Sequence, residues 1–245
     1  MKIALDAMGG DRAPQEMIKG AVAAAREYKL EVLLVGQRAL VEPELEKHPS
    51  SRLSLVEAAE VVEMAESPTL ALRQKKDSSI AVGMELVKQG KASAFVSAGN
   101  SGAIMASALL TLGRQEGIER PALGTVFNSS SHPVLLLDVG ANPDCKPAFL
   151  AQFARLGSEY MERTFDLTRP RVGLLNIGEE EGKGSQLTRE AYGLLKESGL
   201  NFVGNVEGKD IPKGLAEVVV TDGFTGNVIL KLSEGLGEQL FDWLG

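Results

Sequence analysis

The chain has 245 residues, of which 44% are hydrophobic and 24% charged, so it can bury a core of ordinary density without a disulfide or a structural metal. Its formal net charge of −7 argues against nucleic-acid binding through bulk positive charge, and its single cysteine, Cys145, excludes an intramolecular disulfide. The start, MKIALDAMGGD, is too short in its apolar part for a signal peptide, and no run approaches the length of a membrane-spanning helix, so we expect a cytoplasmic protein.

Short runs of β-branched and aliphatic residues alternate along the chain with longer helical patterns, which is typical of a mostly parallel sheet covered by helices on both faces. The patterns predict strands over residues 2–6, 31–36, 52–57, 92–98, 122–127, 134–140, 171–178, 201–206 and 217–222. They predict helices over residues 14–28, 67–90, 101–113, 147–163, 185–198 and 225–244. His132-Pro133 separates two of the strands and allows a hairpin there. No linker divides the chain, so we expect residues 1–245 to form one large doubly wound, three-layer α/β/α domain.

Several predicted strands end in loops that combine glycine with Asp, Asn, Ser or Thr. These loops cover residues 6–11, 97–102, 138–142, 176–178 and 221–227. Ligands of open α/β sheets bind at the carboxyl ends of the strands, where glycine lets main-chain N–H groups approach and the next helix favours an anion. Ordinary turns with polar helix caps have the same composition. Five such loops at one sheet edge favour a site for a small anion with a larger polar tail.

The loops supply the candidate site residues. We expect phosphate or substrate binding by Gly9, Gly10, Ser101, Gly102, Asp138, Asn142, Asn176, Thr225 and Gly226. We expect catalytic roles for Asn227, Asn100, Asp222 and Lys183. The two asparagines are equally typical of helix caps, and a solvated surface lysine is the alternative for Lys183. As a carboxylate, Asp138 would repel phosphate, so we expect it to orient a lysine, a backbone amide or a protonated phosphate oxygen.

Other common site signatures are absent from the sequence. The stretch GEEEGKGS, residues 178–185, is one residue too short between its glycines for a nucleotide P-loop, and no GxGxxG follows the first strand. There is no G-x-S-x-G elbow and no clustered His or Cys, so we expect no cofactor, no metal and a structural role for Cys145. Acyl transfer needs no protein nucleophile if the substrate is one, as inorganic phosphate is. Preorganised N–H donors would then stabilise the oxyanion.

The sequence resembles the bacterial PlsX phosphate acyltransferases in seven stretches, taken in order from Met1 to about Lys231. They are MKIALDAMGGDRAP, SAGNSGA, GRQEGIERPAL, LLLDVGAN, RVGLLNIGEEEGKG, FVGNVEGKDI and VVVTDGFTGNVILK. The resemblance implies reversible formation of acyl phosphate from fatty acyl-acyl carrier protein and inorganic phosphate, for phospholipid synthesis. It also implies a fold similar to isocitrate and isopropylmalate dehydrogenases and phosphate acetyltransferase, a homodimer, peripheral association with the inner face of the membrane, and a functional link to the membrane glycerol-3-phosphate acyltransferase.

Members of that family continue beyond the TDGFTGN motif into a further C-terminal segment, so we expect the site in this sequence to be incomplete. Arg73, Lys75 and Lys76 form a basic cluster in an acidic protein, which suits docking of the strongly acidic acyl carrier protein. Apolar residues recur at helical spacing from Val228 to Leu244, which predicts a core or dimer face. Two alternatives remain: a short-chain phosphate acyltransferase using acyl-coenzyme A, and a non-catalytic small-anion-binding protein of the same fold.

Overall fold

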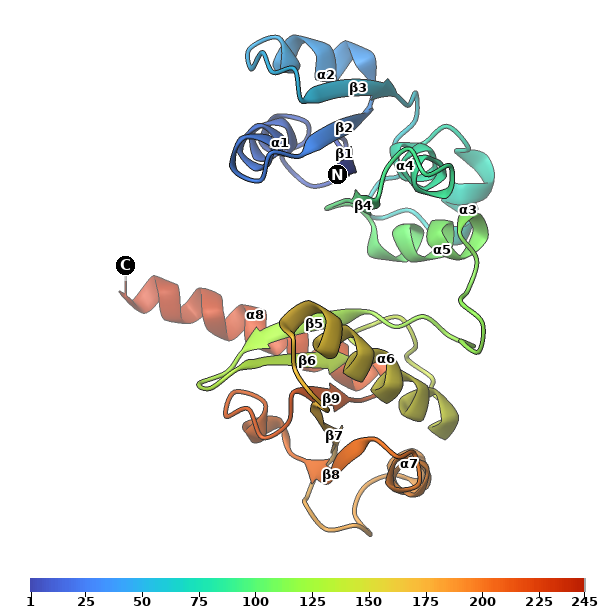
Figure 1. Ribbon diagram of the computed structural model, residues 1–245, viewed down its shortest axis with the longest axis vertical. Helices are drawn as coiled ribbons and strands as arrows, with labels where there is room; N and C mark the ends of the chain where they lie inside the picture. The colour runs from blue at the N-terminus through green and yellow to red at the C-terminus, as the bar shows by residue number, and fades with distance from the viewer. Residues whose placement is uncertain (245) are drawn as a thin grey trace. The chain divides into compact units, whose positions relative to one another are not determined.

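The computed structural model describes residues 1–244 and shows mostly parallel sheets flanked by helices (Figure 1). The chain divides into two compact units, Met1–Gln115 and Glu116–Gly245. Each unit has its own sheet and its own cores, and each is described separately below. The predicted α/β class with a mostly parallel sheet and helices on both faces is confirmed. Its organisation as one domain stays a prediction.

The first unit contains a four-stranded, fully parallel sheet of order β3-β2-β1-β4. Its elements are β1 (Lys2–Asp6), α1 (Gln15–Glu27), β2 (Glu31–Gly36), α2 (Arg38–Leu45), β3 (Leu53–Glu57), α3 (Pro68–Gln74), α4 (Ser79–Lys88), β4 (Ala94–Val96) and α5 (Ser101–Thr111). Alternate residues of β2 point to opposite faces, so Leu34 packs in the core beneath α1 and α2 and Val35 in the core beneath α4.

Two helices of the first unit differ from the sequence prediction. The single helix expected over residues 67–90 is two helices. Between them, the Asp77 carboxylate accepts the N–H of Ala59, and the Glu60 carboxylate accepts the N–H of Asp77. Ser78 then caps α4 by accepting the N–H of Ala81. Helix α2 was not predicted, since Pro43 lies inside it and proline is a signal against helix. Both differences arise from contacts that the local pattern does not contain.

The second unit contains a five-stranded sheet of order β5-β6-β9-β7-β8, parallel except for the β5–β6 pair. Its elements are β5 (Gly124–Asn128), β6 (Pro133–Leu137), α6 (Pro147–Phe165), β7 (Arg171–Leu175), α7 (Gln186–Lys196), β8 (Asn201–Val206), the 3-10 turn η1 (Gly208–Asp210), β9 (Val218–Val220) and α8 (Gly223–Leu244). The hairpin at His132-Pro133 is confirmed. Helices α6 and α7 pack on one face, and the start of α8 packs on the other.

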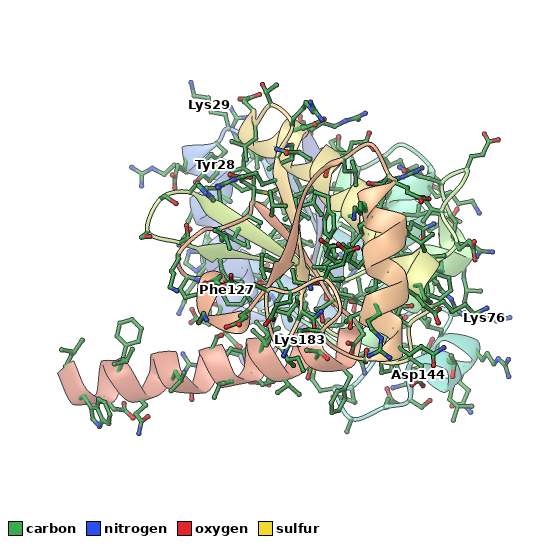
Figure 2. All side chains as sticks on the ribbon, turned by 90° about the horizontal axis from the view of Figure 1, so that it is seen from below. Tyr28, Lys29, Lys76, Phe127, Asp144 and Lys183 are labelled. Carbon is green, nitrogen blue, oxygen red and sulfur yellow. The ribbon has the colours of Figure 1, made fainter. Side chains whose placement is uncertain are left out.

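Helix α8 runs well past the sheet of its own unit (Figure 2). Only Ile229 and Leu230 are partly buried against the core of that unit. Leu232, Leu236 and Leu240 keep 50–61% of their surface exposed. The expected core role of the apolar stripe therefore holds for the first turns alone, and a dimer face stays a prediction. Among the helices of residues 1–244, none combines the length and apolar content needed to cross a bilayer.

The five glycine loops do not lie at one sheet edge, so that expectation is wrong. Loops 6–11 and 97–102 follow β1 and β4 in the sheet of the first unit, whereas loops 138–142, 176–178 and 221–227 follow β6, β7 and β9 in the second. The apolar pattern of a strand reports burial but not which strand is its neighbour. Within each sheet, the loops do stand at the carboxyl ends of parallel strands.

Candidate functional site

In the first unit, the buried Asp6 joins two of the predicted loops. Its Oδ1 accepts a 2.9 Å hydrogen bond from the N–H of Met8, and its Oδ2 accepts one of 2.7 Å from the Ser97 hydroxyl. The same hydroxyl oxygen accepts the N–H of Gly99 at 3.0 Å. Asp6 therefore fixes the loop after β1 against the loop after β4. The sequence signal for this role was weak, because aspartate at a strand end is common in turns.

Gly9 and Gly10 lie where the two loops touch. A Cβ added to Gly9 would come within 2.7 Å of Asp6 Oδ2 and 2.8 Å of the main-chain nitrogen of Gly99. Gly10 has a φ of +97°, a conformation that side-chain-bearing residues rarely adopt. Both positions therefore require glycine for packing and backbone geometry, and their phosphate-binding role stays a prediction.

Asn100 is a helix cap whose amide group is fully engaged. Its Oδ1 accepts the N–H of Ala103 at 3.0 Å, at the start of α5. Its Nδ2 donates to the carbonyl oxygens of Glu63, Met64 and Glu66 at 3.1–3.3 Å. The side chain thus ties the loop before α3 to α5, and binding an anion through it would cost these bonds. Next along the chain, Ser101 is exposed, and a Cβ on Gly102 would lie 2.7 Å from Pro68 Cγ.

The basic cluster is not uniform. Lys75 Nζ donates to the carbonyl oxygen of Val61 at 2.6 Å and to Glu66 Oε2 at 2.7 Å. Hydrogen bonding to Lys75 and to the N–H of Glu63 lowers the pKa of the Glu66 carboxyl. Arg73 and Lys76 are exposed, and Lys76 points outward (Figure 2). Lys75 is therefore held by structural bonds, whereas the exposed Arg73 and Lys76 are better suited to contact a partner.

A polar hollow of about 470 Å³ opens beside these loops in the first unit. Its lining includes Gly10 after β1, Gln37 after β2, and Glu60, Glu63 and Lys75 from the chain that follows β3. It therefore lies at the carboxyl edge of the sheet, where ligands of this fold class bind. Two carboxylates and one ammonium group line it, so it suits a polar group better than a bare phosphate.

In the second unit, Asp138 is completely buried and its carboxylate accepts five hydrogen bonds. Oδ1 accepts the N–H groups of Leu123, Gly140 and Ala141 at 3.0–3.2 Å. Oδ2 accepts the main-chain N–H and the Nδ2 of Asn142 at 2.7 and 2.8 Å. A carboxylate has about four lone-pair sites, so no capacity remains for a ligand. Of the roles expected for Asp138, the orientation of backbone amides is the one that this geometry fits.

Asn142 connects the β6 loop to the start of α8. Its carbonyl oxygen accepts the N–H of Gly223 at 2.8 Å and the Cys145 thiol at 3.3 Å. Its Nδ2 donates also to the carbonyl oxygen of Pro121 at 2.8 Å. Burial raises the pKa of the Cys145 thiol to about 11, so the sulfur stays protonated at neutral pH and is a poor nucleophile. The expected structural role of Cys145 agrees with this environment.

The first turn of α8 carries the remaining polar candidates. Asp222 accepts the N–H of Thr225 on one carboxylate oxygen and its hydroxyl on the other, both at 2.8 Å. A Cβ on Gly226 would stand 1.9 Å from the carbonyl oxygen of Asp138, so only glycine fits there. Asn227 is exposed, and its Nδ2 donates to the carbonyl oxygen of Val139 at 3.0 Å. The Asn227 bond and the close approach of Gly226 hold the first turn of α8 against the loop that follows β6.

Asn176 and Lys183 lie in the loop after β7, the strand next to β9. Asn176 accepts the N–H of Ile177 and donates to the carbonyl oxygen of Lys183 at 3.1 Å. The Lys183 ammonium group is exposed and reaches Glu180 only at 3.9 Å. Asn176 therefore shapes the loop, and Lys183 is the residue there with charge available for an anion.

The structure thus brings the candidates together in two groups. One, in the first unit, contains Gly9, Gly10, Asn100, Ser101 and Gly102. The other, in the second unit, contains Asp138, Asn142, Asp222, Thr225, Gly226 and Asn227, with Asn176 and Lys183 in the loop after the neighbouring strand β7. Among residues 1–244, no cluster of His, Cys, Asp and Glu has the arrangement of a metal site. Sequence reasoning missed Ser97 and Glu66, which hold loops through contacts distant in sequence.

Comparison with known proteins gives a consistent result. A family described as "Fatty acid synthesis protein" has a model that matches residues 1–245. The phosphate acyltransferase of Heliobacterium modesticaldum is 55% identical over 243 residues, which cover 98% of this chain and 72% of the relative. Further relatives that are 48% and 56% identical carry the same name.

Solved structures share the fold. The EutD phosphotransacetylase from Staphylococcus aureus superposes with a TM-score of 0.70 at 20% identity, covering 97% of this chain and 82% of that one. A 4-hydroxythreonine-4-phosphate dehydrogenase from Burkholderia phymatum gives a TM-score of 0.57 at 13% identity, covering 94% of this chain and 83% of that one. Both are similar in architecture alone at these identities, and both agree with the fold expected from the sequence.

Proposed function

The chain belongs to the fatty acid synthesis protein family, and we propose that it transfers a fatty acyl group reversibly from acyl-acyl carrier protein to inorganic phosphate. The observation that carries this proposal is the 55% identity to a phosphate acyltransferase over 98% of the chain. The product, an acyl phosphate, is an activated acyl donor for phospholipid synthesis. The proposal needs two things of the protein: binding sites for two anionic partners, and donors for an oxyanion.

We propose that phosphate attacks the thioester directly. A phosphate oxygen forms a bond to the carbonyl carbon, the carbonyl oxygen carries the negative charge of the tetrahedral intermediate, and the carbon–sulfur bond then breaks. The carrier thiolate leaves and takes up the proton that hydrogen phosphate gives up as it becomes the acyl phosphate dianion. The protonated Cys145 thiol, with its pKa raised to about 11, supports this route over an acyl-cysteine intermediate.

Asn227 and Lys183 are the best-placed polar side chains for this step in the second unit. Only one N–H of the Asn227 amide is used by Val139, so the other is free to donate to an oxyanion. Lys183 has an exposed ammonium group that suits phosphate or the phosphate of the carrier's prosthetic group. In the first unit, the main-chain N–H groups of Ser101 and Gly102 at the start of α5 favour an anion.

We propose that the carrier protein docks on the exposed Arg73 and Lys76, with Lys75 shaping the surface rather than contacting the partner. Opposite charges speed encounter and fix orientation. A homodimer, peripheral association with the inner face of the membrane and a functional link to the glycerol-3-phosphate acyltransferase belong to the same proposal. The exposed apolar face of α8 supports an interface of this kind.

The decisive experiment follows carrier thiol release from acyl-carrier protein in the presence and absence of phosphate, with acyl phosphate trapped by hydroxylamine. Phosphate-dependent release with acyl hydroxamate formation supports the proposal. A stable acyl adduct on Cys145 or any serine, seen by mass spectrometry, contradicts direct attack. Faster turnover of a short-chain acyl-coenzyme A than of acyl-carrier protein with the same acyl chain favours the coenzyme A alternative. Phosphate binding in calorimetry without turnover of either thioester favours the anion-binding protein.

A further inference from the structure

Asp138 has a role that its burial and its partners define. The residue is inaccessible to solvent, and all five hydrogen bonds to its carboxylate come from groups of this chain. An ionised carboxylate is costly to bury unless N–H donors replace its water shell. Here the donors come from the residues just after β6 and from Leu123 before β5. The carboxylate therefore determines how the chain from Gly140 to Asn142 is folded.

That folded loop is also the platform for α8. Its Val139 carbonyl oxygen accepts the Asn227 amide at 3.0 Å, and its Asn142 carbonyl oxygen accepts the N–H of Gly223 at 2.8 Å. Gly226 presses against the carbonyl oxygen of Asp138 itself, so closely that a Cβ would overlap it. Three separate contacts thus set the position of the α8 first turn on the loop, and none of them involves the Asp138 side chain directly.

We propose that Asp138 is a positioning residue, not a ligand for phosphate: its carboxylate shapes the β6 loop, and the loop places Asp222, Thr225 and Asn227. This inference rests on the proposed function for its kinetic part only. Oxyanion donors act through preorganisation, so a displacement of about 1 Å at the reacting groups costs on the order of 10² in rate. Asp138 would therefore act on kcat through groups that it does not touch.

The test is Asp138→Asn, which keeps the side-chain shape but turns an NH2 group toward N–H donors. Asparagine keeps one of the two oxygens, so the variant removes the acceptor either of Gly140 and Ala141 or of Asn142. In hydrogen exchange, the amides on that side should exchange at least about tenfold faster. The amide of Gly223 should follow, although it does not contact Asp138. Leu195→Ala is the matched control, because it truncates a fully buried side chain of the same unit. It should not selectively accelerate exchange of the Gly223 amide.

In steady-state assays, Asp138→Asn should lower kcat about 10²-fold while the phosphate KM changes less than about threefold. Asn142→Ala, which keeps both main-chain bonds of Asn142, should change kcat in the same direction by less, and it provides the test if Asp138→Asn does not fold. Unchanged Gly223 exchange in a folded variant, or phosphate affinity weakened about tenfold at normal kcat, would overturn the inference. If the unmodified protein forms no acyl phosphate, the proposed function fails, while the exchange measurements still decide the role of Asp138.

Discussion

The carboxylate of Glu217 pairs with the guanidinium group of Arg171 at the amino end of β7. Arg171 Nη2 lies 2.6 Å from Glu217 Oε1, and Arg171 Nε lies 3.0 Å from the same oxygen. The same Nη2 also donates to the carbonyl oxygen of Gly214 at 3.1 Å and lies 2.8 Å from His132 Nε2. One guanidinium group therefore connects the segments that precede β6, β7 and β9. These residues lie at the end of the sheet opposite the candidate site, so substitutions in this cluster test the stability of the second unit and not its site.

We predict that unit 2 loses stability in acid through Glu217. Burial alone would raise the pKa of Glu217, but the hydrogen bonds and charge of Arg171 outweigh it and hold the pKa below the usual 4.5. A carboxyl with a lowered folded pKa stabilises the protein above its unfolded pKa, and that stability is lost as pH falls through the folded value. Urea unfolding of Glu217→Gln should therefore lose much of its acid dependence below about pH 4.5. Glu181→Gln, in an exposed pair with Lys196, should keep the original dependence.

Replacing Asn227 distinguishes a catalytic role of its side-chain amide from a purely structural role. If the free N–H donates to the oxyanion, Asn227→Ala should lower kcat by about 10²–10³ and leave the phosphate KM nearly unchanged. Loss of the bond to Val139 alone would cost about 1 kcal/mol of stability at near-normal turnover. Asn201→Ala is the control, because Asn201 Nδ2 likewise donates to a main-chain carbonyl oxygen, that of Arg169, at the other end of the sheet.

The exposed basic residues should govern carrier affinity. Arg73→Ala with Lys76→Ala should raise the KM for acyl-carrier protein and flatten its salt dependence, with a smaller effect on kcat. Lys88→Ala with Lys91→Ala removes two other exposed charges and should change neither value. Lys75→Ala should instead lower the melting temperature, since it removes the bonds to Val61 and Glu66. A KM and salt response that stay the same in the first variant would eliminate this surface as the docking site.

Gly9 should tolerate no side chain. Gly9→Ala would place a methyl group within 2.9 Å of Asp6, Ser97 and the main chain of Gly99, and we expect a loss of about 1–3 kcal/mol in the free energy of unfolding. Gly20→Ala, where a Cβ meets nothing within 4 Å and the residue lies inside α1, should be neutral or stabilising by up to about 1 kcal/mol. Equal stability of the two variants, measured by urea unfolding, would mean that the Gly9 contacts relax at little cost.

The sequence by itself determined most of the local structure, the fold class and the family. Apolar runs such as 134–137 and 218–220 predicted the buried strands of a parallel sheet, and the glycine loops predicted where the carboxyl ends of the strands would be. The break at residues 75–78 and the helix containing Pro43 escaped prediction. Both depend on the tertiary environment, which local propensity does not describe.

Only the tertiary structure decided what each polar candidate is bonded to. A carboxylate such as Asp138 or Asp6 has the same spacing in the sequence whether it binds a ligand or N–H groups of its own chain. The choice depends on burial and on partners as distant as Ser97 and Leu123. The division of the five loops between two sheets was decided in the same way, since strand pairing is a long-range contact that the period of one strand does not encode.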